Sequence, residues 1–205
     1  IGEVCRYLLN RQPSQAEQSH KVRVVVGNGL RSELWDNFEA RFGITRICEL
    51  YGASEGNIGF VNVFNLKRTV GFSPMKFRIV RFDVNTETPV VGHQGYMQRV
   101  KKGEVGLLLS EVSGKAPFDG YTKQDASESK LLRNVFKHGD CWFNTGDLVR
   151  DQGYRHVAFI DRVGDTFRWK SENVATTEVE SELHNFEPRT EAVVYGVKVP
   201  FAEGR

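Results

Sequence analysis

The feature that most constrains this fold is an apolar run followed at once by a glycine loop, a helical pattern and a second apolar run. The β-branched residues of Val22 to Val26 predict a buried strand, and the loop Gly27-Asn28-Gly29-Leu30 follows directly. Between a candidate N-cap at Ser32 and a glycine stop at Gly43, apolar side chains recur at helical spacing. Thr45 to Leu50 predicts the second strand. Strand, helix and strand joined by short loops form a βαβ unit, whose strands are parallel.

The loops after these two strands carry the first candidate site residues. Because the strands are parallel, the loop at Gly27 to Gly29 and the segment Tyr51 to Asn57 should emerge at one sheet edge, where open α/β sheets bind ligands. The second loop combines Gly52 with Ser54 and Glu55. Glycine lets the backbone approach a phosphate, a hydroxyl can donate to a phosphate oxygen, and a carboxylate is a ligand that Mg²⁺ prefers. Taken alone, the residues also fit a strand-to-helix turn with a capping serine and a solvated glutamate.

The middle of the chain has a different texture. Short strand-like runs such as Phe77 to Phe82 and Gly106 to Leu109, separated by turn residues, predict a small antiparallel sheet or barrel from about residue 71 to residue 160. A strand pair is expected over Leu148 to Ile160. The polar segment Gln124 to Lys130 predicts a surface loop or the start of a short helix that Leu131 to Phe136 could continue. The predicted fold class is therefore α/β plus β.

A second small domain is expected to begin near residue 161. Thr177 to Glu180 matches a capping box, and the helix after it would place Val179, Leu183 and Phe186 on one face. Glu191 to Val199 alternates like a strand. This part of the chain is therefore expected to be an α+β unit.

A glycine turn at Phe143 to Asp147 presents a second candidate residue. The Asp147 carboxylate follows an aromatic strand residue, and a carboxylate can accept two hydrogen bonds side by side, as the adjacent hydroxyls of a ribose require. Gly-Asp is also an ordinary turn. This motif therefore carries weight only together with others.

Composition excludes several classes of function. Lys and Arg total 28 against 26 Asp and Glu, so the net charge of +2 does not indicate a nucleic-acid partner. The three cysteines are widely separated, which argues against a disulfide framework or a zinc site and favours a reducing compartment. No apolar run approaches the roughly 20 residues of a membrane span. The start without methionine at Ile1 and the end just after an apolar run suggest an internal piece of a longer protein.

Several separated motifs carry a family resemblance. They are Tyr-Gly-Ala-Ser-Glu-Gly-Asn at 51–57, Asn-Thr-Gly-Asp-Leu at 144–148, Asp-Arg-Val-Gly-Asp-Thr-Phe-Arg-Trp-Lys at 161–170 and Glu-Asn-Val-Ala-Thr-Thr-Glu-Val-Glu at 172–180. In this order they closely resemble the adenylate-forming (acyl-activating, AMP-binding) superfamily. The last two resemble its branch of fatty-acid transport proteins and very-long-chain acyl-CoA synthetases, and the opening at 1–9 and the segments 195–197 and 203–205 also fit that branch.

The resemblance implies an architecture. Residues 1–160 would form the C-terminal part of a large AMP-binding domain, with its α/β part to about residue 65 and a β-barrel-like subdomain from about 71 to 160. Residues 161–205 would form the hinge, at Gly164 and Asp165, and the start of a small C-terminal domain.

The resemblance also implies residue roles. Gly27, Asn28 and Gly29 would line the adenine of ATP or AMP, with Tyr51 packed on its ring and Gly52 beside it. The remaining implied roles are the α-phosphate for Ser54, Mg²⁺ and catalysis for Glu55, the ribose for Asp147 with help from Arg162, and coenzyme A for Lys170 and Ser171. The implied cofactors are thus ATP, Mg²⁺ and coenzyme A.

The implied activity is that of an acid-thiol ligase. A long-chain or very-long-chain fatty carboxylate would react with ATP to give an acyl-adenylate and pyrophosphate, after which the thiolate of coenzyme A displaces AMP. A ligase for another carboxylate, of the bile-acid or carnitine type, and a non-catalytic fatty-acid carrier are the alternatives. The intact set Ser54, Glu55, Asp147 and Arg162 argues against a decayed site.

Two departures limit what these residues can do. The family usually has glycine where Ser171 stands, and its upstream phosphate loop and C-terminal catalytic lysine do not occur in these 205 residues, which alone should be inactive. The resemblance is compatible with a homo-oligomer and with peripheral or anchored membrane association through parts outside this sequence. The expected location is the cytoplasm or the cytoplasmic face of a membrane.

Overall fold

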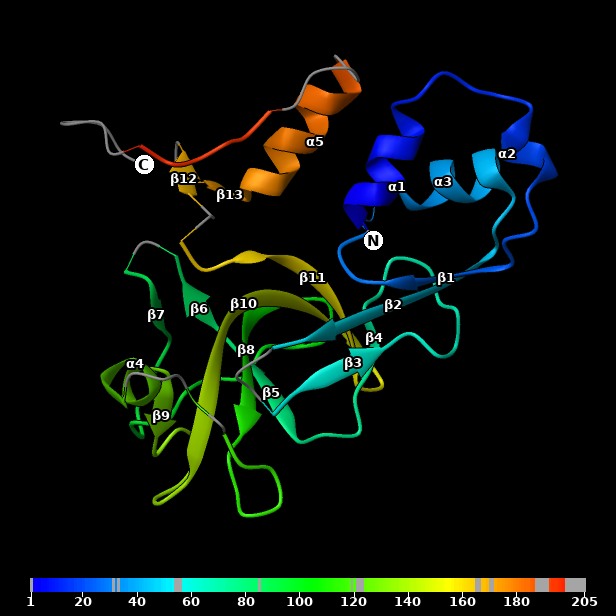
Figure 1. Cartoon of the computed structure of the whole chain (residues 1–205). Coiled ribbons are helices and arrows are strands. Elements are labelled where there is room, and N and C mark those ends of the chain that lie inside the picture. The colour runs from blue at the N-terminus through cyan, green and yellow to red at the C-terminus, as the bar shows by residue number, and fades with distance from the viewer. Residues whose placement is uncertain are drawn as a thin grey trace.

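The chain forms an open mixed sheet with few helices (Figure 1). The computed structural model describes residues 2–30, 32, 34–53, 57–84, 86–118, 120, 124–164, 167–169, 172–186 and 192–197. The helices are α1 (Gly2–Leu9), α2 (Ala16–Ser19), α3 (Trp35–Phe42), α4 (Gln124–Ser129) and α5 (Thr176–Phe186). The strands are β1 (Val24–Gly27), β2 (Arg46–Gly52), β3 (Gly59–Val61), β4 (Gly71–Phe72), β5 (Phe77–Val80), β6 (Phe82–Asp83), β7 (Thr88–Pro89), β8 (Val105–Glu111), β9 (Leu131–Arg133), β10 (Cys141–Gly153), β11 (His156–Arg162), β12 (Phe167–Trp169) and β13 (Glu172–Val174).

The predicted βαβ unit is confirmed. β1 and β2 pair in parallel, and the register runs from Val24 opposite Arg46 to Gly27 opposite Glu49. The helix between them begins later than predicted, because Leu34 rather than Ser32 flanks its first turn and makes no side-chain cap. The Ser32 cap is therefore wrong, and burial of the apolar residues at the start of α3 fixes the helix position instead.

One face of this unit is covered and the other is open. α1 and α3 pack on the covered face, where the buried side chains form one cluster: Cys5, Leu30, Leu34, Trp35, Phe38, Phe42, Ile44 and Ile47. On β1 the opposite side chains, Val24 and Val26, remain 40% and 53% exposed. The prediction of a buried strand at Val22 to Val26 is thus wrong for one face of β1, which is the last strand of the sheet path and leaves that face exposed among the described residues.

β2 extends further than the sequence indicates. It continues through Tyr51 and Gly52, which pair in antiparallel fashion with Phe60 and Gly59 of β3. These two residues therefore belong to a strand, and the connecting loop begins only at Ala53. The early strand end was wrong because the partner strand β3 lies beyond the loop.

The β-rich part continues the same sheet. From β2 the path runs through β3, β4, β11, β10 and β8 to β5, with β9 paired to β10. The α/β-plus-β class is confirmed, but among the described strands the path stays open and the barrel does not close. The centre of this sheet is buried on both faces. Leu107, Leu108 and Leu109 of β8 are all fully buried, with Leu107 and Leu109 in one hydrophobic cluster and Leu108 in another.

The C-terminal elements differ in detail from the prediction. α4 ends at Ser129, and of the residues 131–136 that could have continued it, Leu131–Arg133 form β9 because they pair with β10. α5 begins at Thr176, one residue before the predicted capping box, and the Asp161 carboxylate accepts a hydrogen bond from the Thr176 N–H at 3.0 Å. Phe186 on its predicted apolar face is 89% exposed. Residues 192–197, the described part of the last predicted strand, form no strand.

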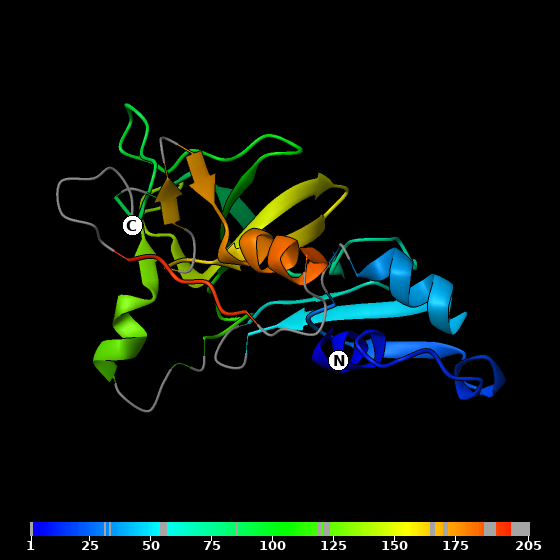
Figure 2. The ribbon, with the colours of Figure 1, turned by 90° about the horizontal axis from the view of Figure 1, so that it is seen from above.

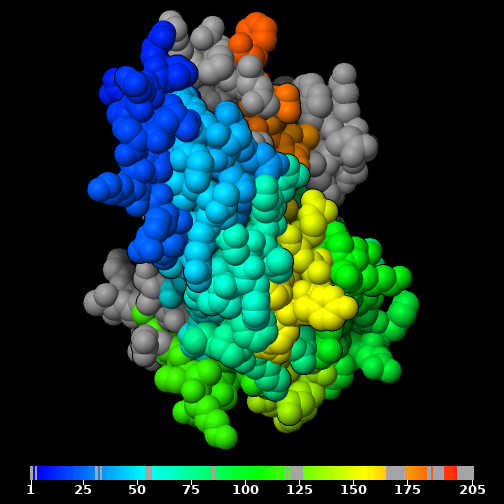
Figure 3. Space-filling model, turned by 90° about the vertical axis from the view of Figure 1, so that its right-hand side faces the viewer, coloured from blue at the N-terminus to red at the C-terminus, as the bar shows by residue number. Residues whose placement is uncertain are grey.

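The molecule is elongated, with the N-terminal helices at one end and most of the β-rich segments at the other (Figures 2 and 3). α5 lies near the β10–β11 hairpin and faces the region of α1 and β1 (Figure 2). Within the described residues, no helix has both the length and the apolar character needed to cross a bilayer.

Candidate functional site

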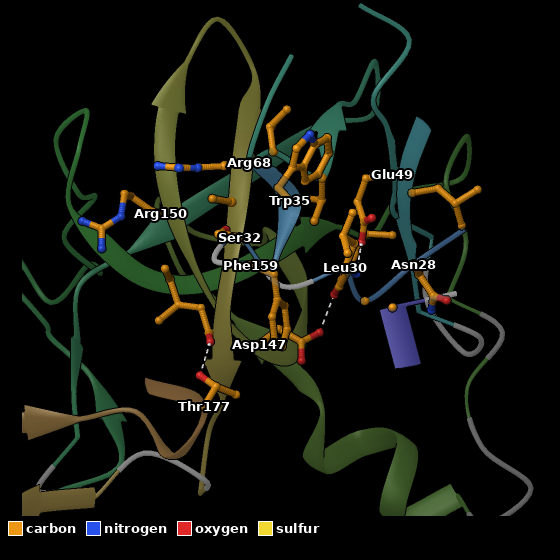
Figure 4. Close-up of a pocket in the computed structure, with 18 of the residues that line it drawn as sticks. Asn28, Leu30, Ser32, Trp35, Glu49, Arg68, Asp147, Arg150, Phe159 and Thr177 are labelled. Carbon is orange, nitrogen blue, oxygen red and sulfur yellow. Dashed lines mark hydrogen bonds between the residues drawn. The ribbon is translucent and has the colours of Figure 1, made fainter. Parts of the chain in front are cut away.

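A cavity of about 1230 Å³ opens where the βαβ unit meets the β10–β11 hairpin. Its volume exceeds the roughly 300–1,000 Å³ of a typical ligand pocket. Figure 4 shows Asn28, Leu30 and Glu49 on one side, Arg68 and Arg150 on the other, and Asp147 between them. α5 adds a further wall through Thr177, Glu178, Ser181 and Glu182.

The first wall is the loop after β1. α1 packs backbone to backbone on this loop, because the Gly2 N–H donates to the Asn28 carbonyl at 2.9 Å and a Cβ on Gly2 would meet the Gly29 oxygen at 1.6 Å. Gly29 has a φ of +80°, which favours glycine. The Leu30 N–H donates to Oε1 of Glu49 at 3.1 Å, so β2 holds the loop from below.

The second wall carries the Asp147 carboxylate. The β10–β8 register shifts between Asn144 and Leu148, and the bulge contains Gly146 with a φ of +77°. The Thr145 hydroxyl donates to the Leu108 carbonyl at 2.9 Å and accepts from the Asp147 N–H at 3.1 Å. The bulge therefore turns Asp147 out of the regular strand pattern and fixes its backbone.

Asp147 joins the two walls. Its Oδ2 accepts a hydrogen bond from the Tyr51 hydroxyl at 2.5 Å, and its Oδ1 lies 3.4 Å from Nε of Arg162 on β11. The Asp147 side chain is 7% exposed and that of Arg162 is 74% exposed. Burial, and then the charge of Asp147, raise the pKa of the Tyr51 phenol above its ordinary value, so this group stays a hydrogen-bond donor at neutral pH.

Six of the sequence-predicted site residues come together here. The cavity is lined by Asn28, Gly29, Tyr51, Gly52, Asp147 and Arg162, while Gly27, the last residue of β1, is not among the lining residues. Gly164 follows β11 with a φ of +98° and is not among the lining residues. The predicted residues Ser54, Glu55, Asp165, Lys170 and Ser171 lie outside the described residues. In the part of the chain that is described, no cluster of acidic, histidine or cysteine side chains could hold a metal ion.

Sequence reasoning missed one buried acid in the first wall. Glu49 is 3% exposed and lines the cavity. Its signal was present, because a glutamate within the apolar run of β2 has to be buried or paired. The sequence also did not indicate that residues of α5 line the cavity, because only the tertiary fold brings them there.

Comparison with solved structures defines the class of fold. No protein-family profile matches the chain. The ATP-bound RpMatB-BxBclM chimera B3 superposes with a TM-score of 0.70 at 22% identity, over 99% of this chain and 37% of that one. The anthranilate CoA ligase AuaEII in complex with anthranoyl-AMP gives a TM-score of 0.65 at 18% identity, over 96% and 35%. The chain therefore has the fold of a part of these adenylate-forming enzymes.

Sequence comparison is more specific. Over all 205 residues the chain is 55% identical to the medium/long-chain-fatty-acid–CoA ligase FadD6 of Mycobacterium tuberculosis, of which it covers 34%. It is 47% identical to long-chain fatty acid transport protein 6 of Mus musculus and 46% identical to protein 3 of Homo sapiens, covering 34% and 31% of them. The resemblance to this branch is thus confirmed along the whole chain, which spans about a third of the length of these relatives.

Proposed function

We propose that these residues carry the nucleotide site of an ATP-dependent ligase that joins long-chain or very-long-chain fatty acids to coenzyme A. The observation that carries the proposal is the buried Asp147 carboxylate, flanked by Tyr51 and Arg162, which faces the Asn28–Leu30 loop across one cavity. A loop whose backbone is exposed beside an aromatic ring suits a flat base, and a carboxylate suits a pair of hydroxyls. A nucleoside has both parts, a flat base and a pair of ribose hydroxyls.

Each residue then has a proposed role. Asn28 and Gly29 line the base, the Tyr51 ring packs on it, and Asp147 accepts hydrogen bonds from the ribose hydroxyls. Asp147 is suited to this because the hydrogen bond from Tyr51 fixes its orientation, and a carboxylate oxygen can accept more than one hydrogen bond. Arg162, being largely exposed, can swing toward the ribose or the phosphates.

The reaction also needs side chains other than those that bind the base and the ribose. An oxygen of the fatty carboxylate attacks the α-phosphorus of ATP, and the bond to pyrophosphate breaks. The thiolate of coenzyme A then attacks the acyl carbon of the acyl-adenylate, which forms the thioester and releases AMP. We assign Ser54 to the α-phosphate and Glu55 to Mg²⁺, which when bound would offset the charge of the phosphate oxygens. Lys170 and Ser171 are assigned to coenzyme A, and residues from 161 onward to a small domain that turns about Gly164 and Asp165.

The setting follows from the substrates. ATP and coenzyme A place the reaction in the cytoplasm or at the cytoplasmic face of a membrane, where the fatty acid would arrive. The names of the transport-protein relatives support a second candidate, a fatty-acid carrier that uses the nucleotide site little or not at all.

One experiment separates these candidates. The full-length protein is incubated with Mg²⁺, ATP, coenzyme A and fatty acids of graded length, and pyrophosphate and thioester are followed. We expect both products, and no thioester with Glu55→Ala. Fatty-acid binding without pyrophosphate or thioester from any acid would refute the ligase and leave the carrier.

A further inference from the structure

Glu49 is a buried carboxyl group that the proposed contacts to the nucleotide do not use. It lies on β2 opposite Gly27 and below the Gly29–Leu30 loop. Its Oε1 accepts the hydrogen bond from Leu30, and its backbone carbonyl accepts one from the Asn62 N–H at 2.8 Å. Its Oε2 is buried and has no hydrogen-bond partner among the described residues. A charged carboxylate with one unsatisfied buried oxygen is costly, and this cost depends on how much water reaches the cavity.

The surroundings of Glu49 offer little to stabilise its charge. Burial raises the pKa of Glu49 to about 7, while hydrogen bonds from the Leu30 and Gly29 N–H groups act in the opposite direction. From α1 the neighbouring titratable group is the Cys5 thiol, whose pKa is raised by its own burial and also by Glu49. From α3 the neighbour is Trp35, which does not titrate, and from β1 it is Gly27, which has no side chain.

We propose that Glu49 is a positioning residue that takes up a proton when a nucleoside covers the Gly29–Leu30 loop, so that binding at this wall is coupled to pH. The inference rests on the proposed nucleotide site. A base that covers the loop would displace water from the cavity that Glu49 lines, which lowers the dielectric constant around the carboxylate and disfavours its charged form. The proton comes from solvent and stays on the carboxyl group. The neutral acid can still accept the hydrogen bond from Leu30, so the loop keeps its position.

The sign of the pH effect follows from linkage. Because the bound state holds more protons, the affinity for a nucleoside should be constant below the pKa of about 7 in the free protein and should fall as the pH rises above it. One proton taken up corresponds to a loss of at most about tenfold in affinity for each pH unit. Glu49→Gln keeps the shape and an acceptor for Leu30 but has no proton to exchange. The affinity of the Glu49→Gln variant for a nucleoside should therefore not change with pH.

The test uses the full-length protein and adenosine, which lacks phosphates that would titrate in the same range. Binding is measured by calorimetry from about pH 6 to about pH 9 for wild type, Glu49→Gln and Cys5→Ala. We expect falling affinity with pH for wild type and Cys5→Ala and a flat profile for Glu49→Gln. If Glu49→Gln does not fold, the wild-type binding enthalpy in buffers of different ionisation enthalpy reports the proton taken up directly.

The outcomes separate this inference from the proposed function. Adenosine binding that is independent of pH, that strengthens with pH, or that keeps its slope in Glu49→Gln would overturn the proton coupling and leave the nucleotide site standing. The coupling is also overturned if binding enthalpies do not depend on the buffer. Absence of both adenosine and ATP binding at every pH would overturn the nucleotide site, and the coupling with it.

Discussion

The two walls of the cavity are built on very different scaffolds. Asp147 stands on β10, whose neighbour β8 is buried on both faces, with Leu107, Leu108 and Leu109 fully inaccessible. The Asn28–Leu30 loop stands on β1, which among the described strands pairs with β2 alone and has an exposed apolar face. The Asp147 wall can hold a bulge because a rigid core surrounds it, whereas the Asn28–Leu30 wall depends on α1 and Glu49 to hold its loop. The difference predicts where substitutions are costly.

The largest effect is expected in the core of the β-rich wall. Phe143 is fully buried and stacks on Phe118 with ring centroids 4.8 Å apart. Phe143→Ala should lower the free energy of unfolding by about 3–5 kcal/mol, because it removes buried surface and leaves a cavity. Urea denaturation of the full-length protein measures this, and a loss below about 1 kcal/mol would break the contrast between the walls.

A smaller effect is expected where β10 begins. Asp140 accepts hydrogen bonds from the Val135, Phe136 and Lys137 N–H groups and from the Trp142 indole. Burial alone would raise its pKa, but these donors outweigh burial and hold the pKa of Asp140 below its ordinary value. Asp140→Asn should cost about 1–3 kcal/mol at neutral pH, since it leaves buried donors unpaired.

The Asp140 contribution has a definite pH dependence. A depressed folded-state pKa means that the stability is fully present above the unfolded value and is lost as the pH falls through the folded value. Denaturation curves of wild type and Asp140→Asn should therefore converge at acid pH. A difference that is the same at acid and neutral pH would show that the charge of Asp140 contributes nothing.

The contact between the walls should have a modest effect. Tyr51→Phe keeps the ring and removes the hydrogen bond to Asp147, at an expected cost of about 0.5–1.5 kcal/mol in unfolding free energy. A double-mutant cycle with Asp147→Asn isolates the pair. Strictly additive costs would show that the walls are not coupled through this bond.

The smallest effect is expected on the open face of β1. Val26 is 53% exposed, so Val26→Ala should change the unfolding free energy by no more than about 0.5 kcal/mol. The same denaturation assay applies. A loss of unfolding free energy as large as that of Phe143→Ala would mean that this face of β1 is covered in the full-length protein. Both walls would then stand on strands that are buried on both faces.

Sequence patterns predicted the local units better than their limits. The parallel pair β1–β2 was readable, because hydrophobic period and glycine position are local signals. The glycine turn predicted at Asp147 is instead a bulge within β10. Pairing between distant strands could not be predicted from local patterns. Tyr51 is a strand residue because it pairs with β3, and part of a predicted helix extension is β9 because it pairs with β10. The exposed face of β1 also escaped, since a β-branched run does not tell how many faces are covered. Nothing in the sequence pattern indicated that Asp161 would cap α5 from β11.

The measurement that tests the central claim most directly is ATP binding by the full-length protein with Asp147→Ala. Calorimetry should give an affinity at least about tenfold weaker than wild type, since charge-assisted hydrogen bonds contribute about 1.5–3 kcal/mol each. Asp151→Ala, on the same strand but not among the residues that line the cavity, is the matched control and should bind like wild type. Unchanged affinity in Asp147→Ala, with a folded protein, would contradict a nucleotide site between these two walls.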